Sequence, residues 1–415
     1  MRILFFSHYF PPERNAPASR TFAHCREWAA AGHAVTVVTC APHHPRGVLY
    51  PGHRNALRHI EYVDGIRVVR CLTLPAANEG TWKRSASFLF YLVSAVCCAM
   101  LEERPDIVIA TSPQFFCGWA GVVAGTLRRR PVLIEIRDLW PESIAAVGAL
   151  HARLVLKVLE AMERGMYRAA SHIVTLGDGY RDGLIQRGVA AERISVVMNG
   201  VDGDLFLPAE PDRQLADRLG VAGRFCITYC GTIGLAHGLE VVLRAARLLL
   251  ERGRSDIVFL LVGDGARLDA LRGDAARAGL DNVMFAGALD RSAIPAVLSV
   301  SDACLVHLRK AGTFSTVMPS KIFESAAMER PIILGVQGFA RDFIARAGCG
   351  ICVEPENEEE LVAAALQLAD DAALRNRLGA AGRAYVTERF DRSRLAERYL
   401  GIIERVVDGA GRRTA

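Results

Sequence analysis

The sequence lacks several features that would point to a function directly. It contains no low-complexity stretch and no run of like charges, and only four of its 50 basic residues are lysines. Its 11 cysteines are scattered through apolar runs without the spacing of a zinc site, which favours buried thiols in a reducing compartment over disulfides or a metal site. Because a strand is expected from residue 2, we predict no signal peptide and a cytoplasmic location.

Positive charge is concentrated in the first half of the chain. Residues 1–200 hold 23 Lys/Arg and 16 Asp/Glu, a net +7, whereas residues 201–415 hold 27 and 29, a net −2. A basic first half suits an anionic partner such as a phospholipid surface or a pyrophosphate-bearing acceptor. Support for nucleic acid is poor, and we predict no nucleic-acid partner.

Short apolar β runs alternate with helical patterns along the first half. The runs are rich in Val and Ile and nearly continuous, as parallel strands covered on both faces should be. Helices are expected between them, for example at Ser19–Ala31 and Arg153–Ala169. The expected strands are Ile3–Ser7, Val35–Thr39, Arg67–Arg70, Asp106–Ala110, Val132–Ile136, His172–Thr175 and Ser195–Met198.

The pattern restarts after Asn199-Gly-Val-Asp202, which places a domain boundary near residues 200–210. We therefore predict an α/β protein of two Rossmann-like, doubly wound domains facing a central cleft, over residues 1–200 and 201–390. Residues 391–415 are expected to form a helix that packs back towards the first domain. The strands expected in the second half are Phe225–Cys230, Ile257–Val262, Val283–Ala286, Ala303–His307, Pro331–Val336 and Gly350–Val353.

Ser85–Leu101 contains no charged residue and is preceded by Trp82-Lys-Arg84. Its length is at the lower limit for a membrane span, and a span would put neighbouring strands of one sheet on opposite sides of the bilayer. Two interpretations remain open, a buried helix and a helix whose Phe88–Leu101 part docks on a membrane surface.

The turn after the first strand, Ser7–Asn15, has no glycine and so differs from the G-x-G-x-x-G turn of a dinucleotide oxidoreductase. The second half offers a better phosphate site. Gly231, Gly234 and Gly238 follow a strand and precede a helix, where backbone amides can face an anion. Taken alone, such a loop can equally be a simple turn.

Pro319-Ser-Lys-Ile-Phe-Glu324 is the stronger signal. Pro319 suits the first position of a helix, and the amides near Ser320 and Lys321 would then attract a diphosphate. Lys321 and Glu324 are three residues apart and share a helix face, which joins a cation for phosphate to a carboxylate for sugar hydroxyls. A solvated Lys–Glu surface pair has the same spacing, so the spacing leaves both interpretations open.

With these motifs in order, the chain resembles the GT-B, family-4 retaining glycosyltransferases over nearly its whole length. The branch it resembles most builds O-antigen, capsule or exopolysaccharide and includes the N-acetyl-L-fucosamine transferases. The matching segments are Tyr9-Phe-Pro-Pro12, Arg137-Asp-Leu-Trp-Pro-Glu142, Asn199-Gly-Val-Asp202, Gly263-Asp-Gly265 and Pro319–Glu324.

The resemblance implies roles for particular residues. Glu324, the second glutamate of the family's Glu-x7-Glu signature, would hold the donor ribose, and Ser320 and Lys321 would contact the diphosphate. Backbone around Phe285 and Gly287 would contact the base. The catalytic residues implied are Asp138, His8 and Lys321, and the loop expected to close over the phosphates contains Arg14, Asn15 and Ala16. Further donor contacts are expected from Gly231, Gly234, His237, Arg309 and Thr316.

The chain departs from the family pattern at several of these positions. Thr316 stands where the first glutamate of the signature is expected, and Thr232 and His237 stand where relatives often carry two cations. Arg309 and Lys310 are the expected replacements for those cations. Phe339 replaces an acidic residue that is usual in this branch.

The resemblance implies transfer of a hexosyl or N-acetylaminosugar with retention, the leaving diphosphate taking the acceptor's proton. UDP is expected rather than GDP as the donor nucleotide, with a polyprenyl-pyrophosphate-linked sugar as acceptor and the inner face of the cytoplasmic membrane as location. No cofactor is expected, and no divalent metal, because we identify no Asp-x-Asp metal motif that could hold one.

Other interpretations remain open. A sugar-nucleotide 2-epimerase would share the two-domain architecture, and a non-catalytic donor-binding partner of a glycan-assembly complex would explain the missing first glutamate. Individual residues also have structural alternatives. His8 can be a packed strand-end histidine, Asp138 can pair with Arg137, and His237 can be a solvated loop residue.

Overall fold

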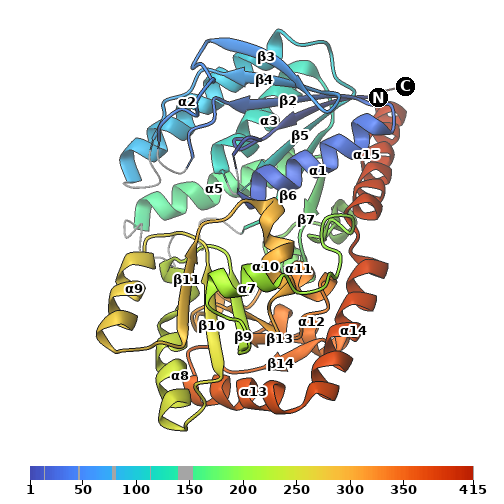
Figure 1. Cartoon of the computed structure of the whole chain (residues 1–415). Coiled ribbons are helices and arrows are strands. Elements are labelled where there is room, and N and C mark those ends of the chain that lie inside the picture. The colour runs from blue at the N-terminus through green and yellow to red at the C-terminus, as the bar shows by residue number, and fades with distance from the viewer. Residues whose placement is uncertain (14, 45–46, 77–80, 113, 139–152, 415) are drawn as a thin grey trace. The chain divides into compact units, whose positions relative to one another are not determined.

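The computed structural model describes residues 1–13, 15–44, 47–76, 81–112, 114–138 and 153–414. The chain forms two compact units, one of residues Met1–Met198 and Arg392–Ala415 and the other of residues Asn199–Asp391 (Figure 1). The last helix, α15 (Arg392–Thr414), therefore belongs to the first unit. None of the helices in the described ranges is long and apolar enough to cross a membrane.

The first unit is built on an eight-stranded sheet with the order β3-β4-β2-β1-β5-β6-β7-β8. All neighbouring strands run parallel except β3, which pairs antiparallel with β4 at the edge. The strands are β1 (Arg2–Phe6), β2 (Ala34–Cys40), β3 (Arg58–Val63), β4 (Ile66–Cys71), β5 (Ile107–Ser112), β6 (Val132–Ile136), β7 (His172–Thr175) and β8 (Ile194–Val196).

Strand β3 is the one element of this sheet that the sequence analysis did not predict. Its sequence, Arg-His-Ile-Glu-Tyr-Val, mixes polar and apolar residues, and none of them is fully buried. Such a strand can occupy only the edge of a sheet whose other strands are covered on both faces. The continuous apolar runs that identify the central strands are therefore missing from it.

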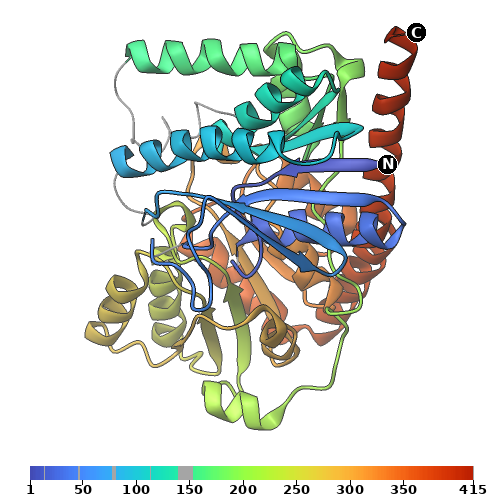
Figure 2. The same cartoon turned by 90° about the horizontal axis from the view of Figure 1, so that it is seen from above.

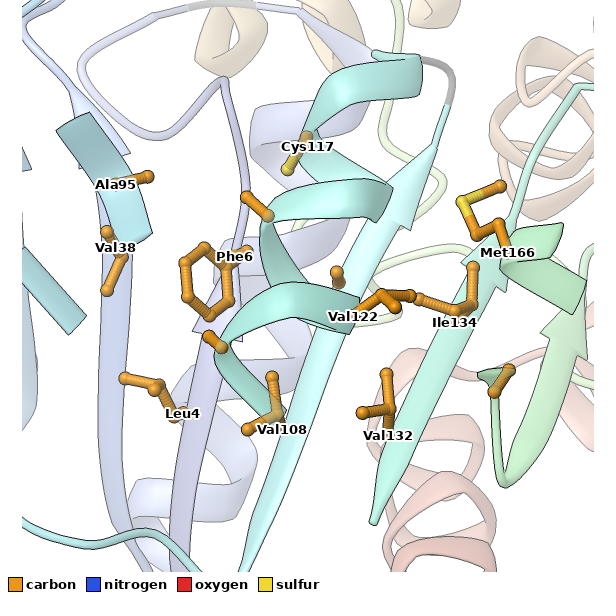
Figure 3. Close-up of a cluster of buried hydrophobic side chains, with 14 of the residues drawn as sticks. Leu4, Phe6, Val38, Ala95, Val108, Cys117, Val122, Val132, Ile134 and Met166 are labelled. Atoms are coloured by element: carbon orange, nitrogen blue, oxygen red, sulfur yellow. The ribbon is translucent and has the colours of Figure 1, made fainter. Parts of the chain in front are cut away.

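Helices cover both faces of the first sheet, and side chains of β1 point alternately to each face. Leu4 and Phe6 belong to the core that also contains residues of α2, α3 and α5 (Figure 3). Phe5 instead lies against Trp28 of α1, on the other face. Figure 2 shows α2, α3 and α5 together on one side of the strands. The helices of this unit besides α15 are α1 (Ala16–Ala30), α2 (Thr81–Met100), α3 (Phe115–Arg128), α5 (Arg153–Ala169) and α6 (Asp178–Gln186).

Helix α15 packs on α1 through aromatic rings. Trp28 donates a hydrogen bond from Nε1 to the carbonyl oxygen of Ala396 at 2.9 Å, and its ring meets Tyr399 edge-on at 5.1 Å. Trp28 and Tyr399 are both fully buried. This burial of two large rings explains why the C-terminal helix is part of the first unit although the second unit precedes it in sequence.

A buried ion pair fixes the end of the first unit's sheet. Arg20 of α1 contacts Glu135 of β6 at 3.2 Å, and both side chains are buried. The same guanidinium donates to the carbonyl oxygens of Val197 and Met198, just before the chain enters the second unit. The arginine thus joins a helix, a central strand and the junction segment, and its charge is compensated inside the fold.

The second unit contains a six-stranded, fully parallel sheet with the order β11-β10-β9-β12-β13-β14. One face is covered mainly by α8 and α13, and residues from α7 and α10 pack on the other. The strands are β9 (Phe225–Cys230), β10 (Ile257–Val262), β11 (Val283–Gly287), β12 (Ala303–His307), β13 (Ile332–Gly335) and β14 (Gly350–Cys352). The helices are α7 (Arg213–Leu219), α8 (Glu240–Glu251), α9 (Leu268–Arg277), α10 (Ile294–Ser299), α11 (Lys321–Ala327), α12 (Phe339–Ala347), α13 (Glu358–Asp370) and α14 (Ala372–Arg389).

Helix α3 lies very close to the first sheet because it contains glycines on its buried face. A Cβ atom added at Gly121 would lie 2.4 Å from the Cβ of Ala110 in β5. We expect Gly121→Ala to lower the free energy of unfolding by about 1–3 kcal/mol, because the clash outweighs the better helix propensity of alanine. Urea unfolding followed by circular dichroism measures this change.

Gly409→Ala on α15 is the matched control. No atom lies within 4 Å of the Cβ that alanine would add there, so the substitution should leave stability unchanged or raise it by up to about 1 kcal/mol. Equal effects of the two substitutions would show that α3 can move away from the sheet at no cost.

Candidate functional site

The loops that leave the carboxyl ends of the second unit's strands contain most of the residues expected at the donor site. All strands of this sheet are parallel, so these loops lie at one edge of it, where open α/β sheets bind their ligands. The loops follow β9, β10, β11 and β12 and cover residues 231–239, 263–267, 288–293 and 308–320.

Two of these loops are in direct backbone contact. A Cβ atom at Gly263 would lie 1.8 Å from the carbonyl oxygen of Gly231, and one at Gly265 would lie 2.4 Å from that of Ile233. The amide of Ile233 also donates to the carbonyl oxygen of Asp264 at 2.9 Å. Gly263 and Gly265 adopt φ of +147° and +154°, so both the close approach and the conformation require glycine.

The Nζ atom of Lys321 is buried beside the glycine loop. It lies 3.6 Å from the centre of the Tyr229 ring, and a Cβ atom at Gly231 would lie 2.8 Å from it. Among the described residues the Nζ atom has no hydrogen-bond acceptor, and burial lowers the pKa of Lys321 to about 7. A buried amine that contacts an aromatic face and lacks an acceptor is suited to an anionic ligand at the loop.

The segment before α11 differs from the prediction in one detail. The helix begins at Lys321, so Pro319 precedes the N-cap, Ser320, and is not the first helical residue. The carbonyl oxygens of Pro319 and Ser320 accept the amides of Ile322 and Phe323, which forms a tight first turn from Pro319 onward. Proline still fits here, because the turn uses its carbonyl group and not the missing N–H.

Glu324 lies in the first turn of α11 with its side chain 19% exposed. Its Oε1 atom is 3.1 Å from Nη2 of Arg291, in the turn after β11. Thr316, which replaces the first glutamate of the family signature, is half-buried in the turn that leads to α11. The sequence analysis missed Arg291, since an arginine in a short polar loop carries no signal of its own.

His307, at the end of β12, links the glycine loop to the loop after β14. Its Nδ1 atom donates to the carbonyl oxygen of His237 at 2.6 Å, and its Nε2 atom accepts the amide of Glu356 at 2.9 Å. The second bond fixes the neutral tautomer, because a nitrogen that accepts an N–H carries no proton. This histidine too was missed, because a residue inside an apolar strand is expected to serve the core.

His237 belongs to the glycine loop, and Arg309 lies against it. Burial lowers the pKa of His237 to about 4, so the imidazole is neutral at neutral pH and supplies no cation. Arg309 donates its amide to the carbonyl oxygen of Ala236, and its guanidinium lies 3.6 Å from Glu240. Lys310 instead contacts Glu354 at 3.7 Å. Of the two expected replacement cations, Arg309 is therefore the one beside the loop.

Phe285 and Gly287 end β11 beside these loops. The Phe285 ring packs on the core, with the guanidinium of Arg272 5.7 Å from its centre. Gly287 has φ +71°, and its carbonyl oxygen accepts the amide of Gly263 at 2.8 Å. The backbone of β11 thus joins the same edge as the glycine loops.

In the first unit, His8 follows β1 and is 2% exposed. Its ring makes edge contacts with Tyr9, His43, Phe88 and Tyr91, at centroid distances of 4.8–6.0 Å. Its backbone oxygen accepts the hydroxyl of Thr39. These contacts are those of a packed strand-end histidine, although the ring borders the carboxyl edge of its sheet.

Asp138 follows β6, and burial raises its pKa to about 6 despite the nearby Arg137. Among the described residues no ion pair joins the two side chains, and Nε and Nη1 of Arg137 lack hydrogen-bond partners. A carboxyl group with this pKa can exchange a proton near neutral pH. The rest of the expected motif, residues 139–142, lies outside the described residues.

The loop expected to close over the phosphates is described only in part, because Arg14 lies outside the described residues. Asn15 is the N-cap of α1 and accepts the amide of Ala18 at 2.9 Å, and Ala16 begins the helix. The Asn15 side-chain oxygen is thus committed to the helix cap. The structure therefore assigns Asn15 a local role at the start of α1.

Asp202-Gly-Asp204, at the domain junction, does have the Asp-x-Asp spacing, so the reason given for expecting no metal is wrong. In the structure Asp202 accepts the amide of Leu205 and Asp204 is exposed. The described residues contain no cluster of three His, Cys, Asp or Glu side chains that could hold a metal ion. The lack of a metal requirement remains a prediction.

Two family models match the chain, one in each unit. "Glycosyl transferase 4-like domain" matches residues 16–200, and "Glycosyl transferases group 1" matches residues 214–385. The 2-deoxystreptamine glucosyltransferase of Streptomyces kanamyceticus is 30% identical over 75% of this chain and 80% of its own. The chain belongs to the group 1 glycosyltransferases. The expectation of a glycosyltransferase is thereby confirmed.

Other proteins resemble this glycosyltransferase over almost its whole length. WcaI of Escherichia coli K12, named as a colanic acid biosynthesis glycosyl transferase, is 27% identical over 88% of this chain and 91% of its own. Sucrose-phosphate synthase from Thermosynechococcus elongatus has a TM-score of 0.76 at 17% identity, covering 98% and 99% of the two chains. Anabaena HepE in complex with UDP-glucose has a TM-score of 0.72 at 18% identity, covering 97% and 99%.

These structures confirm the predicted fold class, two Rossmann-like α/β domains of the GT-B type. The assignment to the N-acetyl-L-fucosamine transferase branch remains a prediction.

The buried amine of Lys321 gives a prediction about stability and pH. Its pKa lies near 7 in the folded protein, below the ordinary value of 10.5, so the unfolded chain binds more protons between these pH values. Folding is therefore penalised most at low pH, and the penalty fades as the pH rises. We expect Lys321→Met to be more stable than the wild type at pH 6 by at least about 1 kcal/mol.

The stability difference between the two proteins should narrow as the pH rises from about 7 towards 10. Urea unfolding of both proteins across this pH range measures the difference, and other titrating groups cancel in it. A difference that is constant or that widens would show that Lys321 is charged and compensated in the folded protein.

Proposed function

We propose that this glycosyltransferase transfers a sugar from a nucleotide-sugar, with UDP as the nucleotide, to a lipid-linked glycan acceptor during surface polysaccharide assembly. The observation that carries the proposal is the buried Lys321 amine at the glycine loop, with Glu324 one turn further along α11. A cation without an acceptor suits the diphosphate, and a carboxylate nearby suits the ribose hydroxyls. UDP-glucose in the HepE complex supports the choice of UDP, and the name of WcaI supports polysaccharide as the product.

The proposed reaction is a transfer with retention of the anomeric configuration. The bond between the sugar's anomeric carbon and the diphosphate oxygen breaks, the acceptor oxygen bonds to the same carbon on the same face, and the acceptor proton passes to the leaving diphosphate. Lys321 and Arg309 would stabilise the charge that develops on the diphosphate. Asp138, whose pKa lies near 6, would orient the acceptor hydroxyl or the transferred sugar. No divalent metal takes part in this scheme.

Helix α2 supports the membrane part of the proposal. One face of it is in the core, through Tyr91, Ala95, Cys98 and Ala99. Its other face carries exposed apolar side chains, since Leu89 and Val93 are 52% and 57% exposed. The helix is thus only partly buried, and its solvent-exposed face is apolar. Such an apolar stripe, on a unit with net positive charge, suits an anionic bilayer surface.

Calorimetric titration of UDP and GDP tests the donor site. We expect UDP to bind the wild type and Glu324→Ala to weaken binding by more than about 1.5 kcal/mol, as for the loss of a charge-assisted hydrogen bond. Glu251→Ala, which removes an exposed carboxylate at the far end of α8, should bind like the wild type. If neither nucleotide binds, or if the Glu324 variant binds equally well, the donor-site assignment is wrong.

Product analysis then separates transfer from its alternatives. The protein is incubated with UDP-sugars and a polyprenyl-pyrophosphate-linked sugar, with and without EDTA. We expect acceptor-dependent, EDTA-insensitive formation of a glycoside that keeps the donor's anomeric configuration. An isomerised free sugar formed without acceptor would indicate an epimerase, and nucleotide binding without turnover across a broad panel would indicate a non-catalytic partner.

Co-sedimentation with vesicles tests the role of α2. Wild-type protein should sediment with vesicles that contain anionic phospholipid, and Leu89→Glu should reduce the bound fraction several-fold, because a charge on the apolar stripe opposes insertion. Tyr62→Glu, at a 70% exposed position on edge strand β3, is the control and should bind like the wild type. Equal binding of all three proteins would exclude α2 as the contact surface.

A further inference from the structure

Arg291 and Glu324 form an ion pair whose geometry leaves donors and acceptors unused. Nη2 of Arg291 lies 3.1 Å from Oε1 of Glu324, but the alignment is not that of a hydrogen bond. Among the described residues, this buried Nη2 atom has no hydrogen-bond partner. The pair is therefore held by charge, while N–H groups of the guanidinium and lone pairs of the carboxylate remain available.

The surroundings hold the guanidinium in place. Arg291 lies over the ring of Phe206, with its central carbon 5.6 Å from the ring centre, and Phe206 is fully buried. The amide of Phe206 is fixed in turn by the carbonyl oxygen of Asp202. The side chains of Arg291 and Glu324 are 35% and 19% exposed, so part of each can be reached from solvent, although Nη2 of Arg291 itself is buried. A preformed, accessible pair with unused polar atoms has the properties of a binding site.

A hydroxyl group is the chemical group that such a pair accommodates best. It can donate a hydrogen bond to the carboxylate and at the same time accept a hydrogen bond from the guanidinium. A phosphate oxygen would be repelled by Glu324, and an amine would be repelled by Arg291. The pair is thus selective for a neutral group that is both donor and acceptor.

We infer that Arg291 is a specificity-determining residue that holds, together with Glu324, a ribose hydroxyl of the donor nucleotide and so selects ribonucleotides over deoxyribonucleotides. The inference rests on the proposed function, because it places a nucleotide at this site. It adds a second residue, from the loop after β11, to the carboxylate of α11. Loss of the hydroxyl would leave both charged groups without the bridging partner, which is why discrimination should be strong.

The experiment compares UDP with 2′-deoxy-UDP and 3′-deoxy-UDP by calorimetry. We expect the wild type to bind UDP at least about tenfold more tightly than one of the deoxy analogues, as for the loss of a charge-assisted hydrogen bond. In Arg291→Ala this ratio should fall to about two- or threefold, mainly because UDP binding weakens. Arg291→Lys, which keeps a cation, should retain an intermediate ratio.

Arg272→Ala is the matched control, since Arg272 is also an arginine over an aromatic ring of this unit, 5.7 Å from the centre of Phe285. It should keep the wild-type ratio. A purely structural role of Arg291 would weaken all three ligands equally, and the ratio would not change. That result, or a wild type that binds UDP and both analogues alike, overturns the inference. If Arg291→Ala does not fold, the inference is tested by the ratio of UDP to deoxy-analogue affinities in the wild type and in Arg291→Lys.

The inference and the proposed function fail in different ways. If the wild type binds neither UDP nor GDP, or if Glu324→Ala binds as well as the wild type, the donor site itself is wrong. If Glu324→Ala loses binding while Arg291→Ala keeps the wild-type ratio of UDP to its deoxy analogues, the donor site stands and only the role of Arg291 is refuted.

Discussion

The contact between the backbones of Gly231 and Gly263 is the constraint on which the candidate donor site depends. Because no side chain separates these loops, the loops after the neighbouring strands β9 and β10 can lie in contact at the carboxyl edge of the second sheet. The approach leaves space beside Gly231, and the Lys321 amine occupies it, over the ring of Tyr229. A larger residue at either glycine would displace the loop, the amine or both. The chemistry proposed for this glycosyltransferase thus follows from a packing condition.

The candidate donor site contains groups that destabilise the folded chain and groups that hold its loops in place. The Lys321 amine is buried without an acceptor among the described residues, which opposes folding, whereas His307 fixes the glycine loop through two hydrogen bonds to backbone groups. The Arg291–Glu324 pair is held by charge alone. Sites that bind charged ligands often carry such unsatisfied groups, because the ligand supplies the missing partner. The first unit instead compensates its buried Arg20 internally, with Glu135 and backbone carbonyls.

Much of the fold could be predicted from the sequence, since continuous Val/Ile runs mark strands covered on both faces. Strands such as β9, β10 and β12 have the predicted bounds. Edge strand β3 could not be recognised, because half-exposed residues at a sheet edge lose the apolar signal. At the site, the motifs marked the glycine loop and Lys321 separately as candidate phosphate contacts, whereas Arg291, His307 and Tyr229 stood in no motif. The positions of these side chains depend on which loops contact one another in the folded chain, and no local sequence pattern indicates such contacts.

By itself, the sequence determined the α/β class and the restart of the pattern near residue 200, because hydrophobic periodicity is a local property of the chain. Its motifs, taken in order, carried the resemblance to the family. Only the tertiary structure decided which contacts hold the predicted C-terminal helix on the first unit, and that α2 is buried on one face and apolar on the other. It also decided that Lys321 faces an aromatic ring and that Glu324 faces Arg291. The physical reason is that burial, pKa and ion pairing depend on contacts between segments far apart in sequence, which only the packed chain brings together.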